Sequence, residues 1–452
     1  MHWLLPLTLA LALGGCLSDP KPAQTNDLAA DSDLAADPDA AATTDTARDA
    51  GPDGDTAPAD TSVDAELPPV QVSNAFPPPP ATLQTRLRPA LVVDLNGDAA
   101  ADLLLPNLGK DATQQGIFVL LGRASGFGET YDAYLPTKAR PEGIAIAHVV
   151  GDARPDLLVV GSSGSKSWLE VFAWSGVPGE LFARPGLARE LTSAPFLPNG
   201  GSFPNDLKPV LLTVADYTAD GVPDLVTSDL YAALLVSPKA WDGPGLAQAQ
   251  FGVVAPTTGL WDAIVGLYNV AGGGQNYLMV HEQFGRLNYF PIDAGGLSSK
   301  EVVVPLGGNQ KGTSPADLDG DGTPDVFGTN GYELSVVRVT PPGGDQLAFE
   351  PSQDLAVPDN ELDDIHAADL DHNGAIDAVL LDNASTQGAE RSAIYVVRDL
   401  YVQGSTLRSP FSVASAQFAF GFHPRSLVVG DFDGDGTSEI LGFDHDGRYA
   451  CF

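Results

Sequence analysis

From about residue 84 onward, short apolar runs alternate with polar loops rich in Asp and Gly. Runs at 91–93 and 103–105 flank one such loop, and runs at 211–214 and 225–226 flank another. Apolar runs this short, bounded by turn residues, predict buried β-strands joined in hairpin-like units. No convincing helical periodicity separates them, so the pattern predicts an all-β fold.

The loop at 317–325, hereafter loop 317, is the best-preserved of these polar segments. It reads Asp-Leu-Asp-Gly-Asp-Gly-Thr-Pro-Asp, with carboxylates at positions 1, 3, 5 and 9 and glycines at positions 4 and 6. Glycine permits the tight backbone path that such a cluster needs. Four carboxylates at close range repel one another unless a cation lies between them. Oxygen ligands at this spacing favour a hard ion, and Ca2+ is the usual choice.

The same spacing recurs in four other loops, named here by their first residue: 94, 216, 369 and 431. The candidate metal ligands through their side chains are Asp94, Asn96, Asp98 and Asp102; Asp216, Thr218, Asp220 and Asp224; Asp317, Asp319, Asp321 and Asp325; Asp369, Asp371, Asn373 and Asp377; and Asp431, Asp433, Asp435 and Glu439. Two further units, at 148–156 and 268–276, keep the flanking strands but have lost ligands. Five matching loops indicate a repeat.

Unit starts at 94, 148, 216, 268, 317, 369 and 431 give a period of roughly fifty to sixty residues, near that of propeller repeats. Later apolar runs, at 116–121 and 393–397, add a third or fourth strand to each unit. Seven units of about four strands predict a seven-bladed β-propeller, with the loops between the first two strands of blades. An outer strand from 70–76 or 81–85 is expected to complete the last blade.

The D-x-D-G-D-G-x-x-D loop between two strands, with a later Phe-Gly turn, resembles the FG-GAP/VCBS repeat. That repeat occurs in integrin α-subunit propellers and in many bacterial surface proteins, and the resemblance covers the chain from about residue 84. It implies three to five structural Ca2+ sites, each with a further ligand from the position 7 carbonyl. Carried over, these carbonyls belong to Ala100, Val222, Thr323, Ala375 and Thr437.

The alternative for each loop is a set of Asx turns without metal. This alternative competes with metal binding in loop 216 and is favoured for the unit at 148. The loops lack the twelfth-position Glu and flanking helices of an EF-hand. Because no His or Cys joins the ligand set, the expected role of the metal is structural and not catalytic.

The chain carries 59 acidic and 23 basic residues, a net charge of −36. Nucleic acids and anionic lipid headgroups both require a basic face, so neither is an expected partner. The acidic balance agrees with calcium ligation.

The first sixteen residues form a short apolar run that ends in Leu-Gly-Gly-Cys16. The run is too short to span a bilayer and is typical of a signal peptide. Its end resembles the lipobox of bacterial lipoproteins, which implies lipidation of Cys16. The run has no Lys or Arg, and a plain cleaved signal or a chance apolar start are the alternatives. Leu17 at the next position implies sorting to the outer membrane of a Gram-negative cell.

Residues 17–69 are rich in Asp, Ala and Pro and lack aromatic residues. Such a segment buries too little surface to offset its ordering entropy, so an extended tether is expected. The predicted organisation is a signal peptide at 1–16, this tether at 17–69, and the propeller at 70–452. The second cysteine, Cys451, is expected in a strand.

No sequence signature of catalysis appears. The segment beginning at His281 has Gly where a zinc-peptidase helix needs its second His. Two functions remain open: a lipid-anchored binding or adhesion module for a protein or glycan, or an enzyme that acts on polysaccharide. The loops at 162–206 and 382–392 are the expected variable surfaces, and tryptophans such as Trp168 could stack on sugars or belong to the core. A monomer that meets the membrane only through its lipid is expected.

Overall fold

The computed structural model describes residues 90–451 with internal gaps. Outside the described part lie residues 1–89, 110–114, 129, 151–153, 165, 178–179, 192–209, 229–232, 255–263, 273–274, 283–284, 299–300, 306–310, 319–320, 322, 330–332, 341–347, 350–352, 357–361, 383–392, 399–415, 420–423, 425, 444–448 and 452. The signal peptide, Cys16 and the tether therefore lie outside it. In the part that is described, no helix has the length and apolar character needed to cross a membrane.

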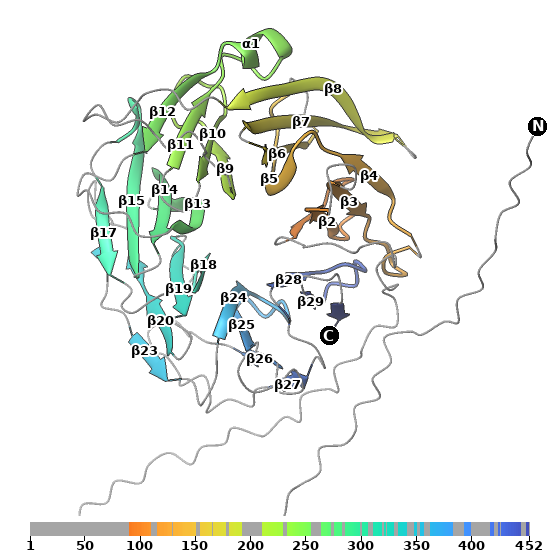
Figure 1. Cartoon of the computed structure of the whole chain (residues 1–452). Helices are drawn as coiled ribbons and strands as arrows, with labels where there is room; N and C mark the ends of the chain where they lie inside the picture. The colour runs from red at the N-terminus through yellow and green to blue at the C-terminus, as the bar shows by residue number, and fades with distance from the viewer. Residues whose placement is uncertain are drawn as a thin grey trace, which may run out of the picture. The chain divides into compact units, whose positions relative to one another are not determined.

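Antiparallel sheets make up the described fold, and strands consecutive in the chain are neighbours in nearly every sheet (Figure 1). The first three sheets are β1 (Leu91–Val93), β2 (Asp102–Asn107), β3 (Gly116–Leu120) and β4 (Ala133–Pro136); β5 (Arg140–Ala147), β6 (Asp156–Ser163), β7 (Lys166–Val177) and β8 (Glu180–Leu191); and β9 (Leu211–Ala215), β10 (Asp224–Ser228), β11 (Ala233–Ser237) and β12 (Gln250–Val254). A short helix, α1 (Gly243–Ala247), precedes β12.

The remaining sheets continue the same up-and-down order. They are β13 (Ile264–Gly272), β14 (Gln275–Glu282), β15 (Arg286–Asp293), β16 (Gly296–Leu297) and β17 (Val302–Pro305); β18 (Gly312–Ala316), β19 (Asp325–Thr329), β20 (Glu333–Val337) and β23 (Gln353–Ala356); β24 (Leu362–Ala368), β25 (Asp377–Asp382), β26 (Ala393–Val397) and β27 (Ala416–Ala419); and β28 (Ser426–Gly430), β29 (Glu439–Phe443) and β30 (Tyr449–Cys451). A two-stranded ribbon of β21 (Val339–Thr340) and β22 (Ala348–Phe349) is attached to the fifth unit.

The first strands of these sheets, β1, β5, β9, β13, β18, β24 and β28, contact one another in turn, and β28 contacts β1. The sheets therefore form a closed ring (Figure 1). The all-β propeller predicted from the sequence is confirmed.

The number of complete blades differs from the prediction. Six sheets have four or five strands, whereas the last, β28–β30, has three. Among the described residues β30 pairs only with β29, and the candidate outer strands at 70–76 and 81–85 lie outside the described part. The structure thus shows six complete blades and not the seven expected.

The core lies between sheets. Seven buried hydrophobic clusters each combine residues of two consecutive sheets, and one of them joins the last sheet to the first. In that cluster Leu103 and Phe118 of the first sheet pack with Val428 and Leu441 of the last. Apolar side chains are therefore buried at every junction around the ring.

The region 162–206 was expected to be a variable loop, and this is wrong for most of it. Residues 166–177 and 180–191 are strands β7 and β8, paired over much of their length. Residues 169–172 of β7 are all buried, and the strand pairs with β6 on one side and β8 on the other, so this segment is an inner strand of its sheet. The expected loop at 382–392 lies outside the described residues from 383 onward.

Candidate metal centres

The acidic loops lie between the first and second strands of their sheets, as predicted. In six units the first strand ends at the residue before position 1, and the second strand begins at position 9. These position 9 residues are Asp102, Asp156, Asp224, Asp325, Asp377 and Glu439. All six loops therefore lie at the same end of the ring.

The loops share one backbone path, which is fixed by side chains that accept main-chain N–H groups. In loop 431, Asp431 Oδ1 and Oδ2 accept from Asp435 N at 3.0 Å and Gly436 N at 2.9 Å. Asp435 Oδ1 accepts from Thr437 N at 2.7 Å. The bonds from positions 5 and 6 to position 1, and from position 7 to position 5, recur in loops 94, 216 and 369.

Positions 4 and 6 adopt left-handed backbone conformations in all four of these loops. Glycine was predicted to allow this turn, and Gly434 and Gly436 have φ of 71° and 89°. The same conformation persists where glycine is absent. The three non-glycine residues with positive φ in the described structure all lie at these positions: Ala99, Ala219 and His372. A conformation that costs energy for these residues is held by the loop as a whole.

The position 9 carboxylate is buried at the start of the second strand. In loop 94, Asp102 is 0% exposed; Oδ2 accepts from Leu95 N at 2.7 Å and Oδ1 from Gly122 N at 2.8 Å. Burial raises the pKa of Asp102 to about 7 although these N–H groups oppose it. The equivalent bond to the residue at position 2 recurs in the units at 148, 317, 369 and 431. The unit at 148 thus keeps the frame, as expected.

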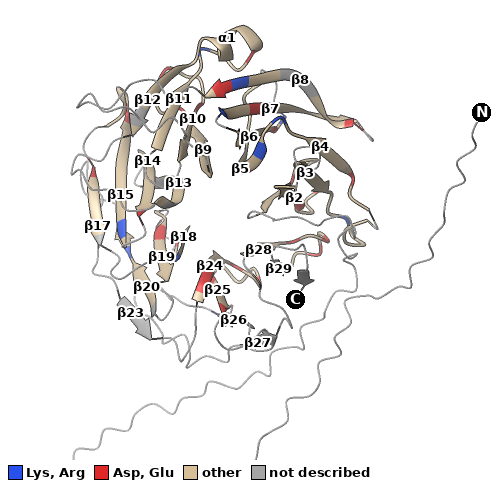
Figure 2. Ribbon diagram, viewed as in Figure 1, with Lys and Arg blue, Asp and Glu red and all other residues tan. Residues whose placement is uncertain are grey.

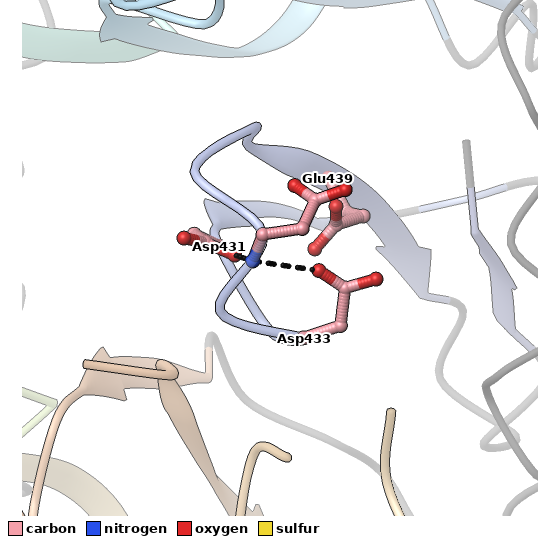
Figure 3. A group of neighbouring side chains, drawn as sticks. Asp431, Asp433 and Glu439 are labelled. Atoms are coloured by element: carbon pink, nitrogen blue, oxygen red, sulfur yellow. Dashed lines mark hydrogen bonds between the residues drawn. The ribbon is translucent and has the colours of Figure 1, made fainter. Parts of the chain in front are cut away.

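Loop 431 brings four carboxylates together (Figure 3). One oxygen each from Asp431, Asp433, Asp435 and Glu439 lies within 4.8 Å of the others. Burial, followed by the charges of the other three, raises the pKa of Glu439 to about 7. A convergent set of carboxylate oxygens, with no cationic side chain paired to them in the part of the chain that the structure describes, fits a hard divalent cation.

Loop 369 differs in one respect. Asp369, Asp371 and Asp377 also offer oxygens within 4.8 Å of one another. However, Arg398 Nη1 lies 2.7 Å from Asp371 Oδ2, so a protein cation already binds one carboxylate of this loop. The arginine follows β26 and was not considered from sequence, because nothing local connects it to position 371.

Loop 317 is described less fully than the other acidic loops. In loop 317, Asp319 lies outside the described residues, while Asp325 accepts from Leu318 N at 3.0 Å and Val339 N at 2.6 Å. In loop 216, Asp224 is fully buried and its pKa is raised, mainly by that burial. The unit at 268 has no acidic loop: β13 and β14 run on and pair up to Gly272 and Gln275.

Position 2 of the loop was not singled out from the sequence, yet it has a constant role. Its side chain is buried in the cluster between its own sheet and the next one in six units: Leu95, Val149, Tyr217, Leu318, Leu370 and Phe432. The sequence does carry a signal for this role, because position 2 is apolar in all six of these polar loops. Each loop is thereby anchored to the junction between sheets.

The remaining residues considered for chemistry are mostly structural. Trp174 and Trp241 are buried in the core, while Trp168 is half-buried with Lys138 Nζ 3.4 Å from its ring centroid. His281 lies in β14 and not in a helix, and burial lowers its pKa to about 3. Cys451 lies in strand β30, as expected.

No family profile matches the chain, and no curated protein matches it either. Solved structures of similar fold include BBS1N in complex with ARL6DN, with TM-score 0.46 and 12% identity over 80% of this chain and 90% of that one. Sqt1 of Saccharomyces cerevisiae has TM-score 0.45 and 11% identity over 78% and 80%. The Pan2 WD40 domain of Neurospora crassa has TM-score 0.42 and 11% identity over 82% and 90%. Similarities at identities this low say nothing about function. The fold itself is identified as an all-β propeller by the sheet topology of this chain.

Proposed function

We propose that this chain is a calcium-stabilised binding module of the FG-GAP/VCBS type, anchored through lipid on Cys16 at the outer membrane or cell surface. The observation that carries the calcium part is the convergence of Asp431, Asp433, Asp435 and Glu439 in loop 431. Loops 94, 216, 317 and 369 share its position in the sheet and much of its hydrogen bonding. Bound calcium would supply positive charge to these carboxylates and stiffen the loop ends.

The role as a binding module is supported by the scaffold. A closed ring of sheets holds its connecting loops at two rigid ends, and loops on rigid scaffolds commonly carry recognition. The metal loops occupy the end where the first strands finish. The opposite end, where β5 begins, is the end we expect to meet a ligand.

That opposite end carries exposed cations and an aromatic side chain on the second sheet. Lys138 precedes β5, and Lys166 and Trp168 lie at the start of β7. Lys166 Nζ is 2.7 Å from Glu190. Elsewhere in the described part Lys and Arg are scattered among more numerous acidic residues (Figure 2). This small group suits one sugar or peptide carboxylate better than a polyanion.

Thermal unfolding of the full chain in EGTA and in about 5–10 mM Ca2+ tests the calcium proposal, at concentrations set by the weak affinity of extracellular calcium modules. Calcium should raise the melting temperature, because it binds the folded loops far better than the unfolded chain. Asp433→Asn should reduce that response, and Asp293→Asn, which lies outside every loop, should not. Equal melting in EGTA and calcium would contradict the proposal.

A glycan and surface-protein binding screen, run with and without Ca2+, tests the recognition role. An assay for product release from acidic polysaccharides should run beside it. Stable binding without product supports the binding module, whereas product without stable binding contradicts it. If lipid on Cys16 anchors the protein, the Cys16→Ser variant should no longer fractionate with membranes. Unchanged fractionation would contradict the anchor.

A further inference from the structure

We propose that loops 94 and 431 bind calcium cooperatively, as one unit that locks the junction between the first and last sheets. The inference rests on the proposed calcium function and adds a coupling between two of its sites. These loops are more than three hundred residues apart in sequence, but they meet where the ring closes.

The first link is a main-chain hydrogen bond that joins the two ligand sets directly. Ala101 N donates to the carbonyl oxygen of Asp431 at 2.6 Å. Asp431 is position 1 of loop 431, and its side chain holds that loop closed. The Ala101 N–H belongs to the same peptide group as the Ala100 carbonyl, the proposed position 7 ligand of loop 94. A cation on that carbonyl would polarise the peptide group and strengthen its N–H as a donor.

A second link runs through the turn after β3. Asp102, position 9 of loop 94, accepts from Gly122 N at 2.8 Å. The next residue, Arg123, donates its main-chain N–H to the carbonyl oxygen of Phe432 at 3.2 Å. Position 9 of one loop is therefore connected to position 2 of the other through two adjacent residues.

Packing leaves the two loops little freedom to move separately. Phe432 is 0% exposed, and its ring centroid lies 5.3 Å from that of Phe127, in the connection between β3 and β4. At Gly122 an added Cβ would lie 2.8 Å from the carbonyl oxygen of Phe432 and nearer still to that of Ala101. A shift in either loop must therefore displace the other.

The other loops show weaker links or none among the described residues. Between loop 431 and loop 369 the main-chain bond runs from Ser438 N to the carbonyl oxygen of Leu370 and is long, at 3.4 Å. In loop 216 the carbonyl oxygen of Tyr217 accepts from Leu297 N of the neighbouring sheet. Loop 216 therefore provides a control site that should bind independently of loop 431.

Hydrogen exchange of the full chain can be measured by mass spectrometry at increasing concentrations of Ca2+. Peptides that contain each loop then report how strongly calcium protects that loop. In Asp433→Asn, the calcium concentration that half-protects the loop 94 peptide should rise about fivefold or more, the low end of ordinary site coupling. Asp220→Asn in loop 216 should leave that midpoint within about twofold. Because coupling between two sites is reciprocal, Asp98→Asn should likewise raise the calcium midpoint of loop 431.

A second variant changes no proposed ligand. Phe127→Ala removes the ring that packs on Phe432, so calcium should still protect both loops while the two midpoints depend less on each other. Shifts below about twofold in both Asp433→Asn and Asp98→Asn, with calcium still protecting both loops, would overturn the coupling alone. If calcium protects neither loop in the unaltered chain, the proposed calcium function fails as well.

Discussion

Arg398 Nη1 lies 2.7 Å from Asp371 Oδ2, so the position 3 carboxylate of loop 369 has a counter-ion supplied by the protein. Calcium must compete with this guanidinium. Partly exposed ion pairs contribute at most about 1 kcal/mol, so Arg398→Gln should tighten calcium binding at loop 369 by about two- to fivefold. Calcium-dependent hydrogen exchange of the loop measures this. Lys166→Gln breaks a comparable ion pair far from the loops and is the matched control; unchanged or weaker binding in Arg398→Gln would contradict the competition.

Calcium and protons should compete for Glu439. Because burial and neighbouring charges raise the pKa of Glu439 to about 7, the metal-free group is largely protonated at pH 6 and largely ionised at pH 8. Calcium binds the ionised form, so affinity at loop 431 should fall about tenfold between pH 8 and pH 6. Titrations at several pH values measure it. Glu439→Gln should bind more weakly at all of them, with a flatter pH profile; identical profiles would count against this role for Glu439.

His281 should make the fold sensitive to acid. It is fully buried in β14, with Nδ1 2.9 Å from Thr313 Oγ1, and burial lowers its pKa to about 3. A histidine whose pKa is lower folded than unfolded contributes stability above pH 6.5 that is lost as pH falls toward 3. From pH 7.5 to 5 the unaltered chain should lose about 2 kcal/mol relative to His281→Gln. Urea unfolding of both proteins tests this, with exposed His148→Gln as control; parallel pH curves for His281→Gln and the unaltered chain would be the contrary result.

Glycine should relieve the strained loop positions. Ala99 and Ala219 have φ of 74° and 57°, and a left-handed conformation costs an L-residue roughly 1–2 kcal/mol. Substitution by glycine removes this strain, but part of the stabilisation is offset by the greater freedom of glycine in the unfolded chain. Ala99→Gly and Ala219→Gly should each raise the free energy of unfolding by about 0.5–1 kcal/mol. The control Ala145→Gly, in β5, should lower the free energy of unfolding. A lower free energy of unfolding in all three variants would contradict the strain argument.

The local parts of this architecture could be predicted from the sequence. The apolar runs at 91–93 and 211–214 correspond to strands β1 and β9. The nine-residue spacing also matches the structure, in which Asp102 and Glu439 begin β2 and β29. Both follow from short-range periodicity and turn chemistry. The loops could be found because their ligand positions lie within nine residues of one another.

Contacts between distant segments could not be predicted in the same way. The bond from Ala101 to Asp431 depends on how the first and last sheets pack, and the ion pair between Arg398 and Asp371 depends on how strands of one sheet align. No local pattern encodes either contact. The apolar position 2 residues point into cores shared with the next sheet, so their role is visible only in the closed ring. The repeat period likewise gave the number of units but not whether the last would have four strands.

The ring closure at β1 and β28 has one more consequence. Every sheet meets its neighbours through a buried hydrophobic cluster, and one such cluster also joins the last sheet to the first. This hydrophobic packing therefore does not depend on which sheet comes first in the chain. In principle, the same sheets could be encoded in a rotated order, beginning at β5 and ending at β4, and still meet the same partners.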